Sequence, residues 1–186
     1  MPSLFYIVYI IWFFSEILIN RLFRSKKTDK QNADKGSLYL LWTIIIIGNF
    51  SAVYVSNKYI MPISNNYIIG YAGLALISLG ILLRFYIIGT LGKFFTVVVT
   101  IKQNHKLKKD GFYKYVRHPS YFASLLSFTG FGISLNNWIS LIIIIVLVSS
   151  AFIIRINIEE KLLIGHFGSE YLEYKGKTKR LIPFIY

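Results

Sequence analysis

A pair of antiparallel membrane helices is predicted by residues 121–154, which read YFASLLSFTGFGISLNNWISLIIIIVLVSSAFII. Two apolar runs, at residues 121–135 and 138–154, are separated only by Asn136 and Asn137. A polar pair between two apolar runs is typical of a tight turn. Fifteen residues rise only about 22 Å as a helix, which is short for a hydrocarbon layer of about 30 Å. We therefore interpret the two runs together as a helical hairpin.

Three more apolar runs precede the hairpin, at residues 2–22, 37–56 and 67–89. Each has about the 20 residues that a spanning helix requires. The chain is 55% hydrophobic and 16% charged, whereas soluble domains carry about 25% charged residues. The sequence predicts an all-α polytopic membrane protein with about five transmembrane helices, forming a single domain over residues 1–186. The first run lacks a basic start and a cleavage site, so we expect it to be retained.

The basic residues predict the orientation in the membrane. Nineteen of the 21 Lys and Arg residues fall within residues 21–35, 93–117 and 155–180. With five spans these three regions lie on one side, which the positive-inside rule makes cytoplasmic. The N-terminus is then outside and the C-terminus inside. Because this topology accounts for the net charge of +13, we do not expect a nucleic-acid partner, and the absence of Cys excludes disulfides and thiolate sites.

Charged and aromatic residues cluster where the hairpin meets the cytoplasm. The sequence Arg-His-Pro-Ser-Tyr at residues 117–121 opens the first hairpin helix, and Arg155, Glu159 and Glu160 follow the second. Because the two helices are antiparallel, both groups lie at the same end. Arg155 and Glu159 share one helix face, since they are four residues apart, so they form either a salt bridge at the membrane exit or one wall of a pocket. Two adjacent carboxylates are poor membrane anchors, which favours a pocket for a cationic or hydroxyl-bearing ligand.

Several other residues have a plain structural interpretation. Gly70, Gly73 and Gly80 in the third run are expected to allow close helix contacts. Arg84 is expected to extend toward the interface near Gly89, at the end of that run, with contact to a substrate as the weaker alternative. The aromatic residues of segment 167–174 predict an amphipathic helix that lies on the bilayer, with Tyr171 and Tyr174 on its apolar face.

Metal and nucleotide sites are not indicated. His105 is expected to be solvated, His118 to cap a helix and His166 to be structural, and the three are too scattered to bind a metal ion. The sequence has no phosphate-binding loop and no dinucleotide fingerprint. A metal centre is therefore not predicted.

Four short motifs together carry a family resemblance: Arg-His-Pro-Ser-Tyr at 117–121, Glu-Glu at 159–160, Phe-Gly-x-x-Tyr-x-x-Tyr at 167–174 and Leu-Ile-Pro at 181–183. Their order and spacing resemble the isoprenylcysteine carboxyl methyltransferases and the related membrane phospholipid methyltransferases, over about residues 86–185. The resemblance implies an S-adenosylmethionine-dependent methyltransferase, releasing S-adenosylhomocysteine, with its cofactor pocket at the cytoplasmic face. It also implies a lipophilic acceptor, most simply the carboxylate of an isoprenylcysteine-like small molecule or protein C-terminus.

The resemblance also assigns residues to roles. The family's substrate Arg matches Arg155, whose guanidinium suits a carboxylate, and Arg117 is expected to assist it in catalysis. A family Gln contact falls near Val98, or at Gln103 in a different loop register. The cofactor-binding positions correspond to His105, Lys106, Leu107, Lys108, Tyr113, His118, Pro119, Ser120, Tyr121, Glu159 and Glu160.

Other functions remain open from the sequence. The same fold could methylate a phospholipid amine, a thiol or a phenolic lipid, although the cationic Arg155 favours an acidic acceptor over an amine. A non-enzymatic membrane scaffold and an NADPH-dependent reductase are further alternatives. The acceptor and the oligomeric state are not predicted.

Overall fold

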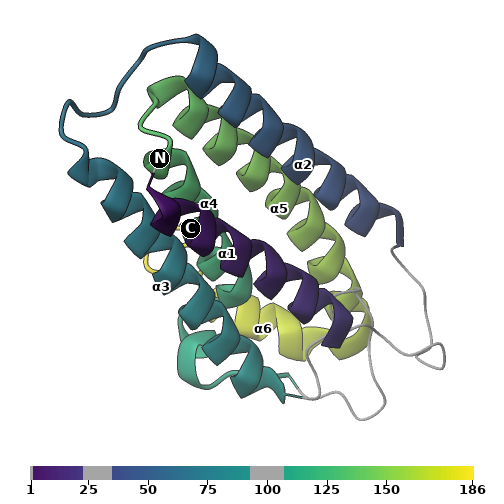
Figure 1. Cartoon of the computed structure of the whole chain (residues 1–186). Coiled ribbons are helices and arrows are strands. Elements are labelled where there is room, and N and C mark those ends of the chain that lie inside the picture. The colour runs from purple at the N-terminus through teal and green to yellow at the C-terminus, as the bar shows by residue number, and fades with distance from the viewer. Residues whose placement is uncertain (1, 23–34, 93–106) are drawn as a thin grey trace.

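The fold is known from a computed structural model that describes residues 2–22, 35–92 and 107–186. Apart from one isolated bridge between Val116 and Lys179, the described residues form helices and loops. The helices are α1 Ser3–Leu22, α2 Lys35–Lys58, α3 Ile68–Leu91, the 3-10 helix η2 Gly111–Lys114, α4 Pro119–Ser134, α5 Trp138–Phe167 and α6 Ser169–Lys177. In Figure 1, α2 runs beside α5, α3 runs beside α4, and α1 lies across the front of the bundle.

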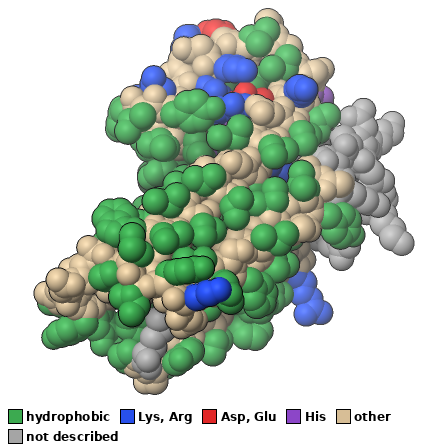
Figure 2. All heavy atoms as spheres, turned by 90° about the horizontal axis from the view of Figure 1, so that it is seen from above, with side chains coloured by type: hydrophobic (Ala, Val, Ile, Leu, Met, Phe, Trp, Pro, Cys, Tyr) green, Lys and Arg blue, Asp and Glu red, His purple; other side chains and the backbone are tan. Residues whose placement is uncertain are grey.

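Four helices of the described residues are long and apolar enough to cross a membrane: α1, α2 from Gly36, α3 and α5. Large apolar side chains cover much of their outer surface, as Figure 2 shows for one face. Phe50 is 74% exposed, Leu82 69% and Ile142 56%. Such surface would be unfavourable in water but is expected where lipid surrounds a protein. The chain is thus an integral, multi-pass membrane protein.

The predicted hairpin is present, with α4 as its short member. The 16 residues of α4 rise about 24 Å, less than the hydrocarbon layer. Its far end nevertheless reaches the loop between α2 and α3. The backbone N–H of Trp138 donates to Met61 O at 2.9 Å, and Asn136 Oδ1 accepts from the N–H groups of Ile63 and Ser64 at 3.1 and 3.0 Å. The turn between α4 and α5 is therefore attached to the loop between α2 and α3.

Small residues bring α3 and α4 into close contact, as the sequence predicted. A Cβ atom at Gly73 would lie 2.5 Å from Ser134 N, and one at Gly80 would lie 2.7 Å from Ala123 O. Gly70 is close to α1 instead, since a Cβ there would lie 3.0 Å from the Phe5 ring. Backbones this close leave no room for a side chain, so these glycines fix the spacing of the helices.

Helix α6 differs from the sequence prediction. Tyr171 is 1% exposed and Tyr174 is 6% exposed, so the aromatic face of α6 packs into the protein rather than onto the bilayer. The Tyr174 hydroxyl donates to Tyr113 O at 2.7 Å, which joins α6 to η2. Packing of Tyr174 against the protein is favoured over packing against lipid, because the loop that carries η2 provides a carbonyl acceptor for its hydroxyl and lipid does not.

Candidate functional site

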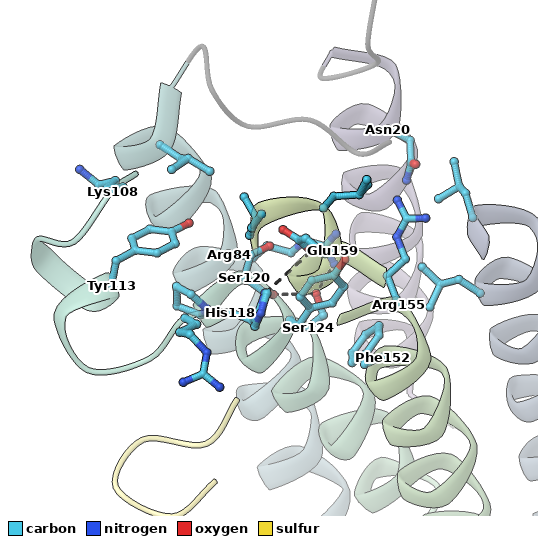
Figure 3. Close-up of a pocket in the computed structure, with 18 of the residues that line it drawn as sticks. Asn20, Arg84, Lys108, Tyr113, His118, Ser120, Ser124, Phe152, Arg155 and Glu159 are labelled. Atoms are coloured by element: carbon cyan, nitrogen blue, oxygen red, sulfur yellow. Dashed lines mark hydrogen bonds and ion pairs between the residues drawn. The ribbon is translucent and has the colours of Figure 1, made fainter. Parts of the chain in front are cut away.

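A deep cavity opens between the helices at the end where α3 and α5 finish and α4 begins (Figure 3). Its empty space, including the open mouth, is about 1350 Å³. Every α-helix contributes to its wall. The lining residues are Glu16, Asn20, Leu38, Leu41, Trp42, Ile45, Arg84, Leu91, Leu107, Lys108, Tyr113, Arg117, His118, Pro119, Ser120, Tyr121, Ser124, Phe128, Phe152, Arg155, Glu159, Leu162, Leu163, Tyr171 and Tyr174.

Arg155 and Glu159 lie one helical turn apart on α5 and both face the cavity (Figure 3). Arg155 is 1% exposed and donates from Nη1 to the Ser37 hydroxyl of α2. The Tyr121 side chain of α4 interacts with both Arg155 and Glu159. A buried guanidinium and a half-buried carboxylate are thereby held in one wall, offering an anion-binding group and a hydrogen-bond acceptor side by side.

The two adjacent carboxylates predicted for the site point in different directions. Glu159 lines the cavity, whereas Glu160 does not, because successive helix residues are about 100° apart. Glu160 Oε1 lies 2.9 Å from Arg117 Nε and 3.3 Å from His118 Nε2. Its other oxygen lies 3.2 Å from Lys175 Nζ. The structure thus separates Glu160, at the centre of a cluster of cations, from Glu159, at the cavity.

Arg117 is placed between the cavity and the C-terminal segment. Besides Glu160, its guanidinium donates to the carbonyl of Lys175 at 3.1 Å and to that of Thr178. Its backbone N–H donates to Lys179 O at 2.9 Å. The guanidinium is therefore held by several protein acceptors. Arg117 lines the cavity, and its assisting role in catalysis stays a prediction.

His118 stands at the start of α4, where Pro119 occupies the first helical turn. The His118 ring is 4% exposed. Its Nε2 atom faces Glu160, and its Nδ1 atom lies 3.8 Å from Glu159 Oε2. The backbone N–H of His118 donates to Arg180 O at 3.1 Å. The ring therefore lies between the two carboxylates and positions both of them.

Tyrosine hydroxyl groups form another part of the wall. Burial raises the pKa of Tyr113 above its usual range, and the nearby charge of Glu159 raises it further. Burial, together with Glu160 and Glu159, does the same to the pKa of Tyr171. Both hydroxyls therefore stay protonated and can donate hydrogen bonds. The Tyr171 hydroxyl is buried and has no hydrogen-bond partner among the described residues, although its side chain lines the cavity.

A charged pair inside the bundle was missed by the functional part of the sequence analysis. Arg84 Nη1 of α3 lies 2.7 Å from Glu16 Oε1 of α1 and also donates to the Ser124 hydroxyl of α4. The prediction that Arg84 extends to the interface was wrong, because its side chain is only 17% exposed and pairs inward. The sequence could have predicted this ion pair, because the first apolar run contains one acidic residue and the third contains one Arg. Charged side chains within membrane spans usually pair with one another.

The remaining predicted residues divide into two groups. Leu107, Lys108 and the segment from Pro119 to Tyr121 line the cavity, with Lys108 Nζ 3.0 Å from Asp110 Oδ1. His105, Lys106, Val98 and Gln103 lie outside the described residues. Ser124, Tyr171 and Tyr174 also line the cavity, although the sequence analysis did not assign them to it.

Comparison with known proteins decides the family. The sequence model of the isoprenylcysteine carboxyl methyltransferase (ICMT) family matches residues 73–165. The chain belongs to this family. The match covers α3, α4 and α5 up to Gly165, and so includes the walls that carry Arg84, His118, Arg155 and Glu159.

Named relatives agree with this assignment. Protein-S-isoprenylcysteine O-methyltransferase B of Arabidopsis thaliana is 39% identical over 115 residues, which cover 61% of this chain and 58% of that protein. The protein-S-isoprenylcysteine O-methyltransferase of Saccharomyces cerevisiae is 40% identical over 115 residues, covering 61% and 48%. The chain spans about half the length of these curated relatives.

A solved structure shares the fold over nearly all of the chain. It is described as the eukaryotic intramembrane Ras methyltransferase ICMT. The two superpose with a TM-score of 0.73 at 27% sequence identity, covering 96% of this chain and 64% of the other. The family resemblance found in the sequence is thereby confirmed, and so is the all-helical membrane fold.

Proposed function

We propose that this protein is an S-adenosylmethionine-dependent methyltransferase that esterifies the carboxylate of an isoprenylcysteine-like acceptor. The observation that carries the proposal is the lining of one cavity, which joins the buried Arg155 and the half-buried Glu159 to an apolar wall. An acceptor with one acidic end and a long apolar body needs both kinds of surface. Membership of the isoprenylcysteine carboxyl methyltransferase family supports the same reaction.

The polar end of the cavity has the groups that S-adenosylmethionine requires. The cofactor carries an ammonium group and ribose hydroxyls, and both can donate hydrogen bonds to a carboxylate such as that of Glu159. Its carboxylate and adenine offer acceptors for donors such as the Tyr171 hydroxyl, which is buried without a partner among the described residues. Lys108, Tyr113 and His118 complete this end, and His105 and Lys106 remain proposed contacts. When bound there, the cofactor supplies an electrophilic methyl group on a sulfonium.

The other end of the cavity suits the acceptor. Leu41, Trp42 and Ile45 of α2, with Phe128 of α4 and Phe152 of α5, form an apolar wall. An isoprenoid chain can pack against these apolar side chains as it does against lipid, without burying an unpaired polar group. Arg155 can hold the acceptor carboxylate through its guanidinium, next to Glu159 on the same helix face. A carboxylate is already nucleophilic, so the residues mainly orient the acceptor and exclude water.

The cytoplasmic side is the proposed location of this cavity. The described Lys and Arg residues near it, at positions 108, 109, 114, 117, 175, 177, 179 and 180, lie at the ends of the helices that open it. The positive-inside rule then places this end, and the C-terminus, in the cytoplasm. Prenylated protein C-termini, the proposed acceptors, would reach the cavity from that side of the membrane.

A different acceptor is the main alternative. A phospholipid amine would have to approach the buried guanidinium of Arg155 in place of the acceptor carboxylate, which is unfavourable for a cation. Thiols and phenolic lipids carry no positive charge, so Arg155 does not disfavour them. They differ from a carboxylate in the product, which is a methyl thioether or a methyl ether instead of a methyl ester. A carboxyl methyl ester is hydrolysed by base to methanol, whereas an N-methyl, S-methyl or O-methyl ether product is not.

The experiment uses the full chain purified in detergent, with methyl-labelled S-adenosylmethionine and a prenylated cysteine analogue. We expect base-labile label in the organic phase, and no label when the carboxylate of the analogue is replaced by an amide. Matched variants are Glu159→Gln and Glu173→Gln, because Glu173 is exposed on α6. Base-stable label, or equal activity of both variants, contradicts the proposal.

A further inference from the structure

A second hollow lies on the surface of the same end of the molecule, outside the cavity described above. It is bounded by the end of α5, the end of α6 and the segment that follows α6. We call it the basic hollow. Its lining residues are Arg117, Asn157, Glu160, Lys175, Thr178, Lys179, Arg180, Ile185 and Tyr186. Figure 2 shows Lys and Arg side chains gathered around a few acidic ones at one end of the molecule.

The charges of the basic hollow do not cancel. Four cationic side chains line it, against the single side-chain carboxylate of Glu160. That carboxylate is already engaged by Arg117 and Lys175, with Arg180 Nη2 at 3.4 Å. Lys179 is exposed and forms no ion pair with any residue that the structure describes. The hollow therefore keeps an excess of positive charge that an anion would neutralise.

The guanidinium of Arg180 does not form all the hydrogen bonds that it can donate. Its Nη1 atom donates to the Tyr186 hydroxyl at 3.0 Å and its Nη2 atom donates to Asn157 Oδ1. Its Nε atom is buried and has no hydrogen-bond partner among the described residues. A buried guanidinium N–H without an acceptor is costly. The hydrogen bonds of the Arg180 guanidinium within the described residues are therefore incomplete.

Exposed apolar side chains border the basic hollow. Phe184 is 79% exposed and Ile185 is 74% exposed. The half-exposed ring of Tyr115 lies 5.9 Å from the ring of Phe184. Aromatic and aliphatic side chains beside Lys and Arg are the composition of a membrane interface, where apolar groups enter the acyl region and cations meet the headgroups.

We infer that the basic hollow binds the headgroup of an anionic phospholipid. The phosphodiester lies near Lys179 and Arg180, and the acyl chains lie along Phe184 and Ile185. Charge complementarity selects an anionic lipid over a zwitterionic one, because the latter brings its own cation to a site that has an excess of them. The inference does not depend on the proposed function, because Lys179 and Arg180 do not line the cavity and the test measures lipid binding.

The test measures binding of short-chain lipids to the detergent-purified full chain by its thermal unfolding temperature. Dihexanoyl phosphatidylglycerol and dihexanoyl phosphatidylcholine have the same acyl chains, so their difference reports the headgroup. We expect saturable stabilisation by phosphatidylglycerol, little by phosphatidylcholine, and little by inorganic phosphate at the same concentration. Raising the salt concentration should weaken the phosphatidylglycerol effect.

Two variants that each remove one charge distinguish specific binding in the basic hollow from non-specific attraction to the positive surface. Lys179→Gln removes a cation that lines the basic hollow, whereas Lys177→Gln removes one from the same segment that pairs with Glu173 and does not line it. We expect Lys179→Gln to weaken phosphatidylglycerol binding about fivefold and Lys177→Gln to leave it unchanged. Equal stabilisation by both lipids, equal loss in both variants, or equally tight binding of inorganic phosphate would each overturn the inference.

Discussion

Arg84 of α3 and Glu16 of α1 form an ion pair at 2.7 Å between two membrane-spanning helices. Their side chains are 17% and 12% exposed, and both line the cavity. The pair connects α1 to the α3–α4 pair, at the level of Ser124. It also keeps the guanidinium of Arg84 neutralised by a carboxylate of the protein itself.

Removing one member of this pair should be worse than removing both. Arg84→Gln leaves the Glu16 carboxylate buried without its cation, and we expect the free energy of unfolding to fall by about 3 kcal/mol. The double variant Glu16→Gln/Arg84→Gln should recover much of that loss, because two amides can pair without charge. A double-mutant cycle on thermal unfolding in detergent measures the coupling. Additive effects of the two changes would show that the pair has no energetic role.

Glu159→Gln should prevent cofactor binding without unfolding the protein. The carboxylate is half-buried at the cavity, and its loss removes charge-assisted hydrogen bonds of about 1.5–3 kcal/mol each. The dissociation constant for S-adenosylmethionine should therefore rise by 10-fold or more in calorimetry. Glu160→Gln serves as the comparison, because Glu160 lies away from the cavity among Arg117, His118 and Lys175. Glu160→Gln should lower the free energy of unfolding more than it lowers the affinity for S-adenosylmethionine. If Glu160→Gln weakened cofactor binding and Glu159→Gln did not, Glu160 rather than Glu159 would be the cofactor contact.

Arg155→Lys should separate cofactor binding from turnover. Lysine keeps the positive charge, so the buried site stays compensated, but it cannot form the paired hydrogen bonds of a guanidinium with a carboxylate. We expect S-adenosylhomocysteine binding within about threefold of the parent and kcat/KM lower by about 100-fold. The measurement combines calorimetry with the methyl-transfer assay. A parallel loss in both readouts would instead place Arg155 at the cofactor.

Tyr171→Phe and Tyr174→Phe should have opposite effects on the ligand-free protein. The Tyr171 hydroxyl is buried without a partner among the described residues, so its removal should leave stability unchanged or raise it. The Tyr174 hydroxyl donates to Tyr113 O, so its removal should cost about 1 kcal/mol. If the Tyr171 hydroxyl binds the cofactor, Tyr171→Phe should also weaken S-adenosylmethionine binding. Unchanged affinity would exclude that contact.

The same tyrosines predict a pH dependence at the alkaline end. Burial raises the pKa values of Tyr113, Tyr171 and Tyr174 in the folded state. The unfolded chain therefore loses protons first as the pH rises past about 10, and stability falls from that point. Below pH 10 these groups are protonated in both states and contribute no slope. Unfolding temperatures measured from pH 8 to 11 check this, and Tyr113→Phe should flatten the decline.

Gly80→Ala should push α3 away from α4. The new Cβ would lie 2.7 Å from the carbonyl oxygen of Ala123, which is backbone and cannot move aside locally. We expect a loss of about 1–3 kcal/mol in the free energy of unfolding. Gly89→Ala is the matched control, because no atom lies within 4 Å of its added Cβ. Similar unfolding temperatures for both variants would show that α3 and α4 are less closely packed.

The sequence by itself determined the membrane character, the apolar core of each long helix and the hairpin of α4 and α5, although α5 continues past the predicted end at residue 154 to Phe167. These depend on the local run of apolar residues, which does not require knowledge of distant neighbours. It also determined that Arg155 and Glu159 share one face, because helical periodicity fixes their separation. The four motifs at residues 117–121, 159–160, 167–174 and 181–183 together then indicated the family.

Only the tertiary structure decided which partners meet. Whether Glu159 or Glu160 faces the cavity depends on the rotation of α5 about its axis, and the pairing of Arg84 with Glu16 depends on the relative depth of two helices. The inward packing of Tyr171 and Tyr174 depends on the position of the loop that carries η2. Composition and periodicity contain none of these quantities, since each is fixed by packing between segments far apart in the chain.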